Sequence, residues 1–295
     1  MRRFFVLVFL LLALSTALAT TYPVTVTDDL GRQVTLTHEP HRIVSMIPSS
    51  TETVCAEGAC DRLVGVDQYS NYPASVQKLP HLGNGFAPNL EVLVALKPDL
   101  VLADESSTEL VDKLTALDIP VYAGTAQSLS EVYQKFRTIG KLIDEETPAA
   151  VLSGRVQGAV DAVQHMLEGL PRPTVYYELD TTPYSVGPSS YIGQLIARAG
   201  GTNIVPADKG QYPQLDPEFI VQQNPDVIIL ADAPSGVTIQ SVTTRPGWDT
   251  LNATENRRIV ALTQTQVDEL NRPGPRIPQA IELLAHILHP DAFPN

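Results

Sequence analysis

Two stretches of the chain repeat one local pattern. The first reads NLEVLVALKPDLVLAD from Asn89, and the second reads DPEFIVQQNPDVIILAD from Asp216. In each copy a glutamate, Glu91 or Glu218, stands at the same spacing before a Pro-Asp step, and a run of branched apolar residues follows. Because a helix tends to end before a proline and branched residues favour strands, each copy predicts a helix that leads into a buried strand. The repeat therefore predicts two similar structural units.

The rest of the chain alternates short apolar runs with helical stretches. In the first half of the chain the apolar runs are RIVSMIP, LVGVD, DLVLAD and IPVYAG, and helices are predicted over residues 50–57, 90–96 and 107–117. In the second half the runs are TVYYELD, DVIILAD and RRIVALT, and helices are predicted over residues 191–199 and 278–288. Near the N-terminus, YPVTVTDDLGRQVTL alternates on both sides of a Gly-containing turn, which predicts a β-hairpin. Short buried strands that alternate with helices indicate mostly parallel sheets. We therefore predict an α/β fold with two Rossmann-like lobes.

A segment with helical periodicity alone lies between the two predicted lobes. Apolar residues recur at helical spacing from residue 130 to about residue 170, with an interruption near Pro148. We predict that this long, rigid helical segment, rather than a Gly-rich hinge, joins the lobes, and that the ligand cleft lies between them. The predicted boundaries are an N-terminal lobe over residues 20–128, a helical backbone over residues 129–170 and a C-terminal lobe over residues 171–295.

The first 19 residues have the order of a secretory signal peptide. Arg2 and Arg3 precede an apolar run that ends in the small residues before Thr20. This order predicts cleavage after Ala19; a short anchor helix is the alternative. No cysteine follows the apolar run, so the chain offers no acceptor for bacterial lipid attachment. We expect an exported, periplasmic protein without a lipid anchor.

The charge balance argues against two classes of partner. The chain has 20 Lys and Arg against 33 Asp and Glu, and loss of Arg2 and Arg3 with the signal peptide leaves a net charge of about −15. A surface of this sign repels nucleic acid and anionic membranes. We therefore expect neither as a partner.

Cys55 and Cys60 are the two cysteines of the chain. An exported protein folds in an oxidising compartment, where a pair this close can form a disulfide across the turn at Gly58. The alternative is that both are buried small residues at a helix end. No histidine lies near them in sequence, so neither interpretation indicates a metal site.

Several phrases of the sequence resemble those of one protein family. They are RIVSMIPSSTETVCAEG, RLVGVDQYSNYP, NLEVLVALKPDLVLAD, YSVGPSSYIGQLIARAGGTNIV, YPQLDPEFIVQQNPDVIIL and RPGPRI. In order and spacing they are similar to the exported substrate-binding proteins of ABC importers for cobalamin, ferric siderophores and haem, and most of all to the cobalamin binders. The resemblance covers nearly the whole mature chain. It implies two α/β lobes bridged by a rigid helix, in a monomer without enzymatic activity or cofactor that delivers a bulky metal chelate to a membrane permease dimer.

The same resemblance implies which residues surround the ligand. They are Tyr69, Tyr72, Phe86, Tyr184, Tyr212, Asp268 and Arg272. Aromatic rings suit a large, flat, amphipathic ligand because each ring offers wide apolar contact with little loss of rotamer entropy. Taken singly, each aromatic could equally pack within its loop, and the Asp-Arg pair could be an ordinary surface ion pair. Trp248 is expected to pack inside its lobe rather than to contact ligand.

The chain also departs from the pattern of the cobalamin binders. Where those proteins carry tryptophans, this sequence has Tyr212 in the second lobe and reads GNGF around Gly85 and DESS around Glu105 in the first. Arg272 and the tyrosines would also suit a chelate that bears carboxylates or catecholates. The resemblance therefore leaves the ligand open among cobalamin, a ferric siderophore and haem.

The repeated glutamates have a role in the resemblance as well. In the family, one exposed glutamate on each lobe pairs with arginines of the two membrane subunits, and the matching positions are Glu91 and Glu218. A pseudo-symmetric pair of carboxylates can address a two-fold symmetric partner through charge-assisted hydrogen bonds. The alternative is that each glutamate only complements the dipole of its helix from the first turn.

Two other functions compete with chelate transport. A receptor for free zinc or manganese would need several His and carboxylate ligands at the lobe edges, but of the histidines only His81 falls in a predicted cleft loop, and His286 and His289 are expected to cap the last helix. We therefore predict no metal ligands. An exported hydrolase would need a nucleophile with a base, and the chain contains no G-x-S-x-G, H-E-x-x-H or phosphate-binding glycine motif.

Overall fold

The N-terminal lobe is built on a four-stranded parallel sheet. The computed structural model describes residues 20–293 of the chain. The sheet has the order β4-β3-β5-β6, with β3 (Ile43–Ser45), β4 (Leu63–Val66), β5 (Leu100–Ala103) and β6 (Val121–Ala123). Every residue of β3, β5 and β6 is buried, because helices cover both faces of such a sheet and leave no face for polar side chains. Its helices are α1 (Pro48–Ala56), α2 (Leu90–Ala95) and α3 (Thr108–Ala116), with the short turns η1 (Cys60–Arg62) and η2 (Ala74–Lys78).

A β-hairpin precedes this sheet, as predicted. Strands β1 (Val24–Thr27) and β2 (Gln33–Leu36) pair antiparallel. The turn between them depends on Asp28, whose carboxylate accepts hydrogen bonds from the backbone N–H groups of Leu30 and Arg32. Gly31 has a φ of 75°, in the left-handed region that glycine adopts without strain.

The C-terminal lobe repeats the architecture with a second parallel sheet. Its order is β10-β9-β7-β8, with β7 (Thr174–Glu178), β8 (Thr202–Asn203), β9 (Val227–Leu230) and β10 (Ile259–Ala261). The helices are α6 (Tyr191–Arg198), α7 (Pro217–Gln223), α8 (Ile239–Thr243), α9 (Asn252–Glu255), α10 (Gln264–Asn271) and α11 (Ile277–Leu288), with the short turns η3 (Ala207–Lys209), η4 (Ala233–Ser235) and η5 (Pro290–Ala292). The predicted fold of two mostly parallel α/β lobes is confirmed. Helices α8, α9 and α10 were not predicted; α8 and α9, with five and four residues, are too short to display a helical period.

The repeated sequence pattern forms the same structure in both lobes. In the first copy α2 leads into β5, and in the second α7 leads into β9. The helices end in the same way: Lys97 and Asn224 have φ values of 48° and 44°, and a proline follows each. A residue in the left-handed conformation ends a helix, and the proline that follows cannot continue it.

The aspartate that follows the proline in each copy, Asp99 or Asp226, explains why the helix-to-strand pattern occurs once in each lobe. The Asp99 carboxylate accepts hydrogen bonds from the backbone N–H groups of His41 and Arg42, both at 2.9 Å, directly before β3. The Asp226 carboxylate accepts one from the backbone N–H of Thr174, at 2.9 Å, at the start of β7. Asp99 therefore joins the start of β5 to the start of β3, and Asp226 joins the start of β9 to the start of β7. These bonds fix the register of the two central strands of each sheet.

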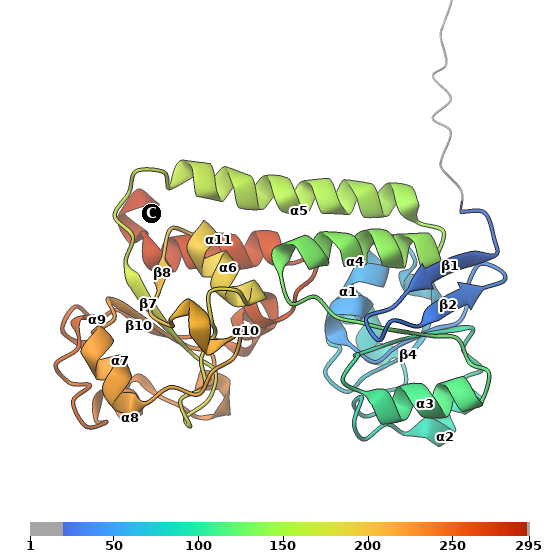
Figure 1. The fold of residues 1–295 in the computed structure, drawn as a ribbon, viewed down its shortest axis with the longest axis horizontal. Coiled ribbons are helices and arrows are strands. Elements are labelled where there is room, and N and C mark those ends of the chain that lie inside the picture. Colours follow the sequence, from blue (N-terminus) through green and yellow to red (C-terminus); the bar gives the residue numbers. More distant parts are fainter. Residues whose placement is uncertain (1–19, 294–295) are drawn as a thin grey trace, which may run out of the picture.

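Two helices, rather than one, connect the lobes. They are α4 (Leu129–Leu142) and α5 (Glu146–Met166), which lie side by side, with α5 running along one side of both lobes (Figure 1). The helical segment was predicted, but the interruption falls at residues 143–145 instead of near Pro148. The chain reverses at Asp144, which has a φ of 59°, whereas Pro148 lies in the first turn of α5, where its missing N–H breaks no helical hydrogen bond.

Helix α4 belongs to the cores of both lobes. Val132 and Phe136 pack in the same hydrophobic cluster as β7 and α11 of the C-terminal lobe. One to two turns later, Ile139 and Leu142 pack with β3 and β5 of the N-terminal lobe. A displacement of one lobe against the other would therefore disturb a packed core, which is close-packed and resists deformation. Within residues 20–293, no helix is both long and apolar enough to cross a membrane.

Candidate ligand cleft between the lobes

A cavity of about 430 Å³ lies where the two lobes meet. Its walls come from both lobes: Ile47, Pro48, Ser49, Tyr69, Asp104, Thr125, Ala126 and Gln127 from the first, and Tyr212, Asp268, Asn271, Arg272 and Pro273 from the second. In the N-terminal lobe these residues follow the carboxyl ends of β3, β4, β5 and β6. Ligands of open α/β sheets bind at this end of the strands, so the cavity is the candidate ligand cleft.

The predicted aromatic residues all expose their side chains to solvent. The exposed fractions are 58% for Tyr69, 45% for Tyr72, 75% for Phe86, 43% for Tyr184 and 45% for Tyr212. Among the described residues with a large exposed hydrophobic side chain, these five are the aromatic ones. Tyr69 and Tyr212 line the cavity, whereas the other three do not. Exposed aromatic surface that no other part of the chain covers is typical of an interaction site.

Short hydrogen-bonded turns hold the aromatic side chains of the N-terminal lobe in position. The Asp67 carboxylate accepts hydrogen bonds from the Tyr69 backbone N–H at 2.7 Å and from the Ser70 hydroxyl at 2.5 Å. Burial raises the pKa of Asp67 above its usual value, against the opposing effect of these hydrogen bonds. In the same way, the Asn84 side chain accepts from the backbone N–H groups of Phe86 and Ala87.

Backbone hydrogen bonds join the two aromatic loops of the C-terminal lobe. The backbone N–H of Ser185 donates to the Pro213 carbonyl, and that of Gly187 donates to the Gln211 carbonyl. Tyr184 therefore stands on one loop and Tyr212 on the neighbouring one. The backbone of each loop is thus held by the other, so neither tyrosine stands on a long unsupported segment.

A buried carboxylate ties the two lobes together at the edge of this cavity. Glu52 of α1 has a side chain that is 1% exposed. It accepts two hydrogen bonds from Arg276 of the other lobe, at 2.8 and 2.7 Å, and a third from Arg272 at 3.0 Å. Because a buried charge is tolerated only with a partner, the position of Glu52 depends on the opposite lobe.

The remaining donors of Arg272 extend this network. Its guanidinium also donates to the Asn71 side chain at 2.8 Å and to the Tyr69 carbonyl at 3.0 Å, and forms an ion pair with Asp268 at 3.0 Å. Asp268 in turn accepts from Asn71 across the lobe boundary at 2.8 Å. The Arg276 guanidinium lies 4.7 Å from the centre of the Tyr72 ring. The structure therefore places Asp268 and Arg272 in the cleft wall and Tyr72 beside it, all engaged in contacts between the lobes.

Sequence reasoning missed the partners that make this network. Glu52, Asn71 and Arg276 had no assigned role, although Glu52 stands within the otherwise uncharged stretch SSTETVCA. A single carboxylate on a helix that is expected to be buried is the available signal, since such a group needs a cationic partner. Its partners lie more than 200 residues away along the chain, so no local sequence pattern identifies them.

Comparison with known proteins agrees with this geometry. Residues 43–265 match the family described as periplasmic binding protein. The chain belongs to this family. It is 33% identical over 282 residues to an uncharacterised ABC transporter substrate-binding lipoprotein of Bacillus subtilis, covering 92% of this chain and 87% of that one. It is 34% identical over 288 residues to a cobalamin-binding protein of Halobacterium salinarum, covering 92% and 75%.

A solved structure of the family has the same fold. A possible iron-binding periplasmic protein of Staphylococcus epidermidis superposes with a TM-score of 0.75 at 30% identity, covering 85% of this chain and 100% of that one. The chain is therefore a periplasmic binding protein of the ABC-transporter type with two α/β lobes. The names of these relatives differ in ligand, so membership of the family does not choose among ligands.

The two repeated glutamates of this periplasmic binding protein occupy equivalent positions. Glu91 and Glu218 are each the second residue of a helix, α2 and α7, and both are exposed. Figure 1 places α2 and α7 on the same side of the molecule, opposite α5. Neither glutamate lines the interlobe cavity.

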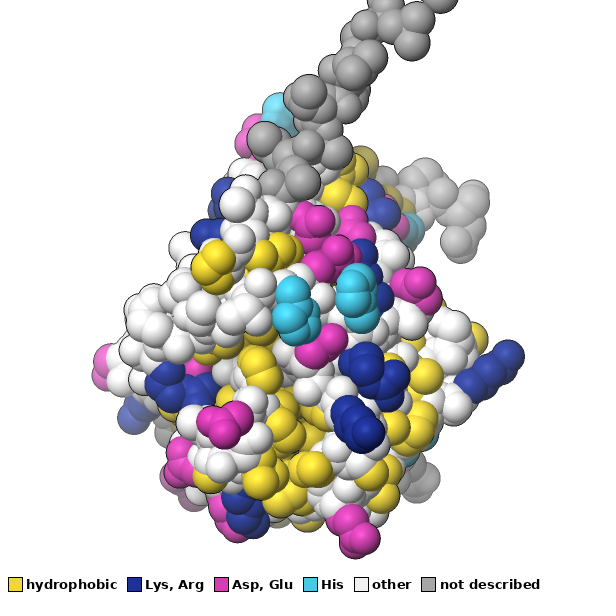
Figure 2. Space-filling view, turned by 90° about the vertical axis from the view of Figure 1, so that its right-hand side faces the viewer, with side chains coloured by type: hydrophobic (Ala, Val, Ile, Leu, Met, Phe, Trp, Pro, Cys, Tyr) yellow, Lys and Arg dark blue, Asp and Glu magenta, His cyan; other side chains and the backbone are white. Residues whose placement is uncertain are grey.

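On the N-terminal lobe, hydrophobic side chains gather on the half of the outer face that lies toward α2, below a band of acidic and histidine side chains (Figure 2).

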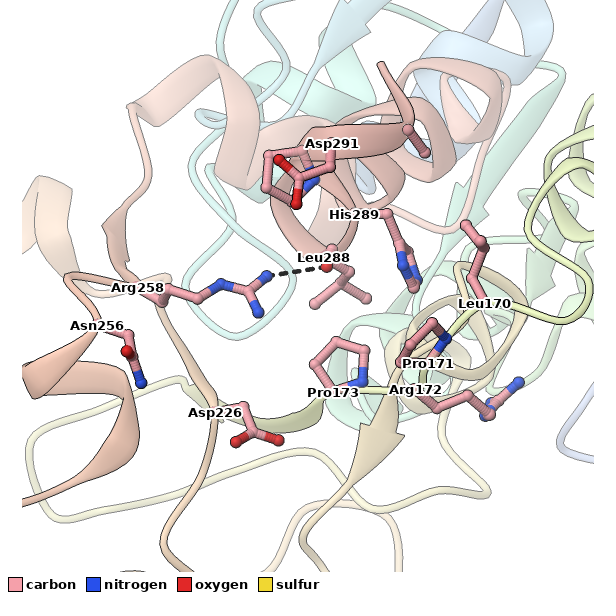
Figure 3. A pocket seen from close by; sticks show the side chains of 12 residues that line it. Leu170, Pro171, Arg172, Pro173, Asp226, Asn256, Arg258, Leu288, His289 and Asp291 are labelled. Atoms are coloured by element: carbon pink, nitrogen blue, oxygen red, sulfur yellow. Dashed lines mark hydrogen bonds between the residues drawn. The ribbon is translucent and has the colours of Figure 1, made fainter. Parts of the chain in front are cut away.

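A second cavity, of about 670 Å³, lies at the amino ends of β7, β9 and β10 in the C-terminal lobe (Figure 3). Its two arginines have structural partners. Arg258 donates to the carbonyls of Ile287 and Leu288 at the end of α11, and Arg172 donates to those of Ala197 and Gly201 at the end of α6. Figure 3 shows the first of these guanidinium groups turned toward Leu288. These arginines stabilise helix ends, so we do not assign a ligand to this cavity.

The arginine contacts correct one prediction about the last helix. His289 was expected to complement the dipole of α11 as a cation, but its side chain is buried and burial lowers its pKa below the usual value. Arg258 supplies the cation at that helix end instead. The other histidine of that turn, His286, packs its ring against Phe293.

The two cysteines and the tryptophan have structural positions. Cys55 and Cys60 form a disulfide at the end of α1. Trp248 is 1% exposed and packs edge-on against Tyr176, as expected. Within residues 20–293, no group of three or more His, Cys, Asp or Glu side chains could hold a metal ion.

We predict that the variant Glu52→Gln has a lower free energy of unfolding than the wild type, although glutamine has nearly the same side-chain shape as glutamate. The substitution removes the two hydrogen-bonded carboxylate contacts of the buried Arg276 guanidinium and leaves it the Glu269 carboxylate at 3.9 Å. Breaking such a buried pair costs about 3–5 kcal/mol of the free energy of unfolding. Urea unfolding followed by circular dichroism measures it. Glu109→Gln is the matched control, because it removes a carboxylate that pairs with Lys113 on the exposed surface of α3; its unfolding midpoint should equal that of the wild type. Equal midpoints for Glu52→Gln and the wild type would show that the interlobe network does not stabilise the fold.

Proposed function

We propose that this protein is the extracytoplasmic substrate-binding component of an ABC importer and delivers a bulky metal chelate to a membrane permease. The observation that carries the proposal is that two exposed aromatic side chains, Tyr69 of one lobe and Tyr212 of the other, line the interlobe cavity. Wide aromatic faces suit a flat, amphipathic ligand such as a metal macrocycle. We propose Tyr69, Tyr72, Phe86, Tyr184 and Tyr212 as its apolar contacts, with Asp268 and Arg272 as polar groups of the cleft wall.

The charges of the cleft bear on which chelate it accepts. Among the described residues that line the cavity, Arg272 is the one lysine or arginine, and its guanidinium is already bonded to Glu52, Asp268 and Asn71. The lining also includes the carboxylate of Asp104. A haem with two propionates or a ferric catecholate would therefore bring negative charge to a wall without an uncommitted cation. Cobalamin, whose periphery carries mainly neutral amides, avoids this cost, and we favour it over the ferric siderophore and haem.

Two alternative functions are weaker. A receptor for free zinc or manganese would need a cluster of ligands, and the described residues offer no group of three or more; the ring of His81, the one histidine predicted near the cleft, lies 3.1 Å from the Asp67 carbonyl. An exported hydrolase would need an activated nucleophile in the cleft. Ser49 and Thr125 line the cavity, but no histidine does. We therefore propose a binding protein and not an enzyme.

The predictions about export fall outside the described residues. The signal peptide with cleavage after Ala19 covers residues 1–19, and the absence of a lipid anchor rests on the same segment. Membership of a periplasmic binding protein family supports export across the membrane. The Bacillus subtilis relative is named a lipoprotein, so the mode of membrane attachment differs between that protein and our proposal. We further propose that the protein acts as a monomer.

We also propose that Glu91 and Glu218 dock the two lobes on the permease. Their support is geometric: both carboxylates are exposed, both stand at the second position of equivalent helices, and both helices lie on the same side of the molecule (Figure 1). A partner with two related subunits can present one arginine to each. The helix dipole explains an acidic residue at each helix start, but it does not require the two helices to share one side.

The first prediction of this proposal concerns the cleft. We expect isothermal titration with cyanocobalamin to show saturable binding, and titration with haemin or a ferric tris-catecholate to show weaker binding. Tyr184→Ala and Tyr212→Ala should each weaken the binding of cyanocobalamin by about 1–3 kcal/mol, because each removes apolar contact area. The control Met166→Ala removes an exposed apolar side chain of α5, outside the cleft, and should bind as the wild type. Unchanged affinity in both tyrosine variants would contradict their assignment, and tighter binding of Zn²⁺ than of any chelate would favour the metal receptor.

The second prediction separates docking from helix stabilisation. In the double variant Glu91→Lys, Glu218→Lys, ligand affinity should stay at the wild-type value while uptake of the ligand by cells is abolished. Charge reversal replaces attraction to the arginines of the permease by repulsion. If both glutamates only complement helix dipoles, the variant loses about 0.3–1 kcal/mol of stability per site and uptake continues. Normal uptake by the double variant would end the docking proposal.

A further inference from the structure

A groove of about 840 Å³ lies on the C-terminal lobe beside Glu218. Three segments form it: the loop after β7, the first turns of α7 and the segment after α8. They contribute Thr181, Pro183, Asp216, Pro217, Glu218, Val221, Gln222, Arg245, Pro246, Gly247 and Trp248. Prolines and a valine make most of its walls apolar. It shares no lining residue with the interlobe cavity, so a molecule in this groove would leave the ligand cleft free.

A buried ion pair fixes one wall of the groove. The Arg245 guanidinium donates two hydrogen bonds to the Glu178 carboxylate, at 2.5 and 2.7 Å, and the Glu178 side chain is fully buried. The same guanidinium lies 4.6 Å from the centre of the Trp248 ring. The segment after α8 is thus attached to the end of β7, and the groove is formed before any partner arrives. A preformed site loses less conformational entropy on binding.

The rim of the groove is acidic. Its one arginine is neutralised by Glu178. On the solvent side stand the exposed side chains of Asp216 and Glu218, and Asp216 caps α7 by accepting from the Glu218 backbone N–H. The groove therefore combines an apolar interior with negative charge at its edge, which complements a partner segment that carries an apolar residue beside a basic one.

We propose that this groove receives an apolar side chain from the loop of the membrane permease whose basic residue pairs with Glu218. The inference rests on the docking role proposed above for that glutamate, and it adds the contact that would supply most of the buried apolar area at the C-terminal lobe. Glu218 itself lines the groove, so a loop that reaches the carboxylate also reaches the groove. Apolar anchors in preformed pockets carry much of the binding energy of protein interfaces, whereas exposed ion pairs mainly set orientation and association rate.

The test measures binding of the whole mature protein to its cognate permease in lipid nanodiscs by biolayer interferometry. Val221→Glu places a charge in the groove, and Thr181→Trp fills it from an exposed position on the opposite loop. We expect each to weaken permease binding by about tenfold or more. Gln223→Glu is the matched control, because it adds the same charge to the same helix outside the groove lining, and it should bind within about twofold of the wild type.

Two readouts keep the outcomes distinct. Each variant is first checked for unchanged cyanocobalamin affinity and melting temperature, and Thr181→Trp keeps the test valid if Val221→Glu does not fold. Wild-type permease affinity in Thr181→Trp and in the folded Val221→Glu, together with lost affinity in Glu218→Lys, would overturn the groove contact and leave the docking role of Glu218 intact. Wild-type affinity in Glu218→Lys would contradict that docking role itself. Light scattering that shows a dimer dissociated by Thr181→Trp would overturn the proposal in favour of a second copy of this chain as the occupant.

Discussion

The relation of the two lobes depends on the carboxylate of Glu52 and the interlobe network around it. This carboxylate is buried, and its counter-charges, Arg272 and Arg276, come from the other lobe. Separating the lobes would leave the Glu52 carboxylate without its charged partners, whereas the two arginines would keep Asp268 and Glu269 of their own lobe; an unpaired buried charge costs more than the loss of most single contacts. Helix α4 reinforces this constraint, because one of its ends packs in the C-terminal core and the other in the N-terminal core. The two lobes are therefore held at a set distance before any ligand is present.

The character of the cleft follows from this constraint. Arg272 is committed to the network between the lobes, so the wall of the cleft presents the rings of Tyr69 and Tyr212, neutral polar groups and the carboxylate of Asp104 instead of a free cation. The same network positions Tyr69, through its carbonyl, and Tyr72, through the guanidinium over its ring. A rigid cleft loses little conformational entropy on binding, which favours affinity, but it cannot close around a small ligand. This combination favours a ligand large enough to touch both lobes at once.

Local patterns in the sequence predicted the elements of the fold well. The apolar runs located the core strands of both sheets, and the repeated Pro-Asp pattern located α2 with β5 and α7 with β9. The interruption of the connecting helices was misplaced because Pro148 is tolerated in a first helical turn, whereas the reversal occurs at Asp144. The family resemblance, rather than a local pattern, assigned five aromatic residues to the cleft, and two of them, Tyr69 and Tyr212, line the interlobe cavity. What the sequence could not reveal is the network of Glu52 with Arg276, since an ion pair between residues 224 positions apart leaves no local pattern.

We infer that the lobes keep their distance when ligand binds. It is tested most directly by double electron–electron resonance between spin labels at Leu117→Cys in the N-terminal lobe and Ile239→Cys in the C-terminal lobe, two exposed positions. The native cysteines are joined in a disulfide, so the labels attach only at the new sites. With and without cyanocobalamin, the distance distributions should coincide within about 1 Å. A shift of the main distance by more than about 2 Å on binding would contradict the account, because it would require the contacts of Glu52 to open.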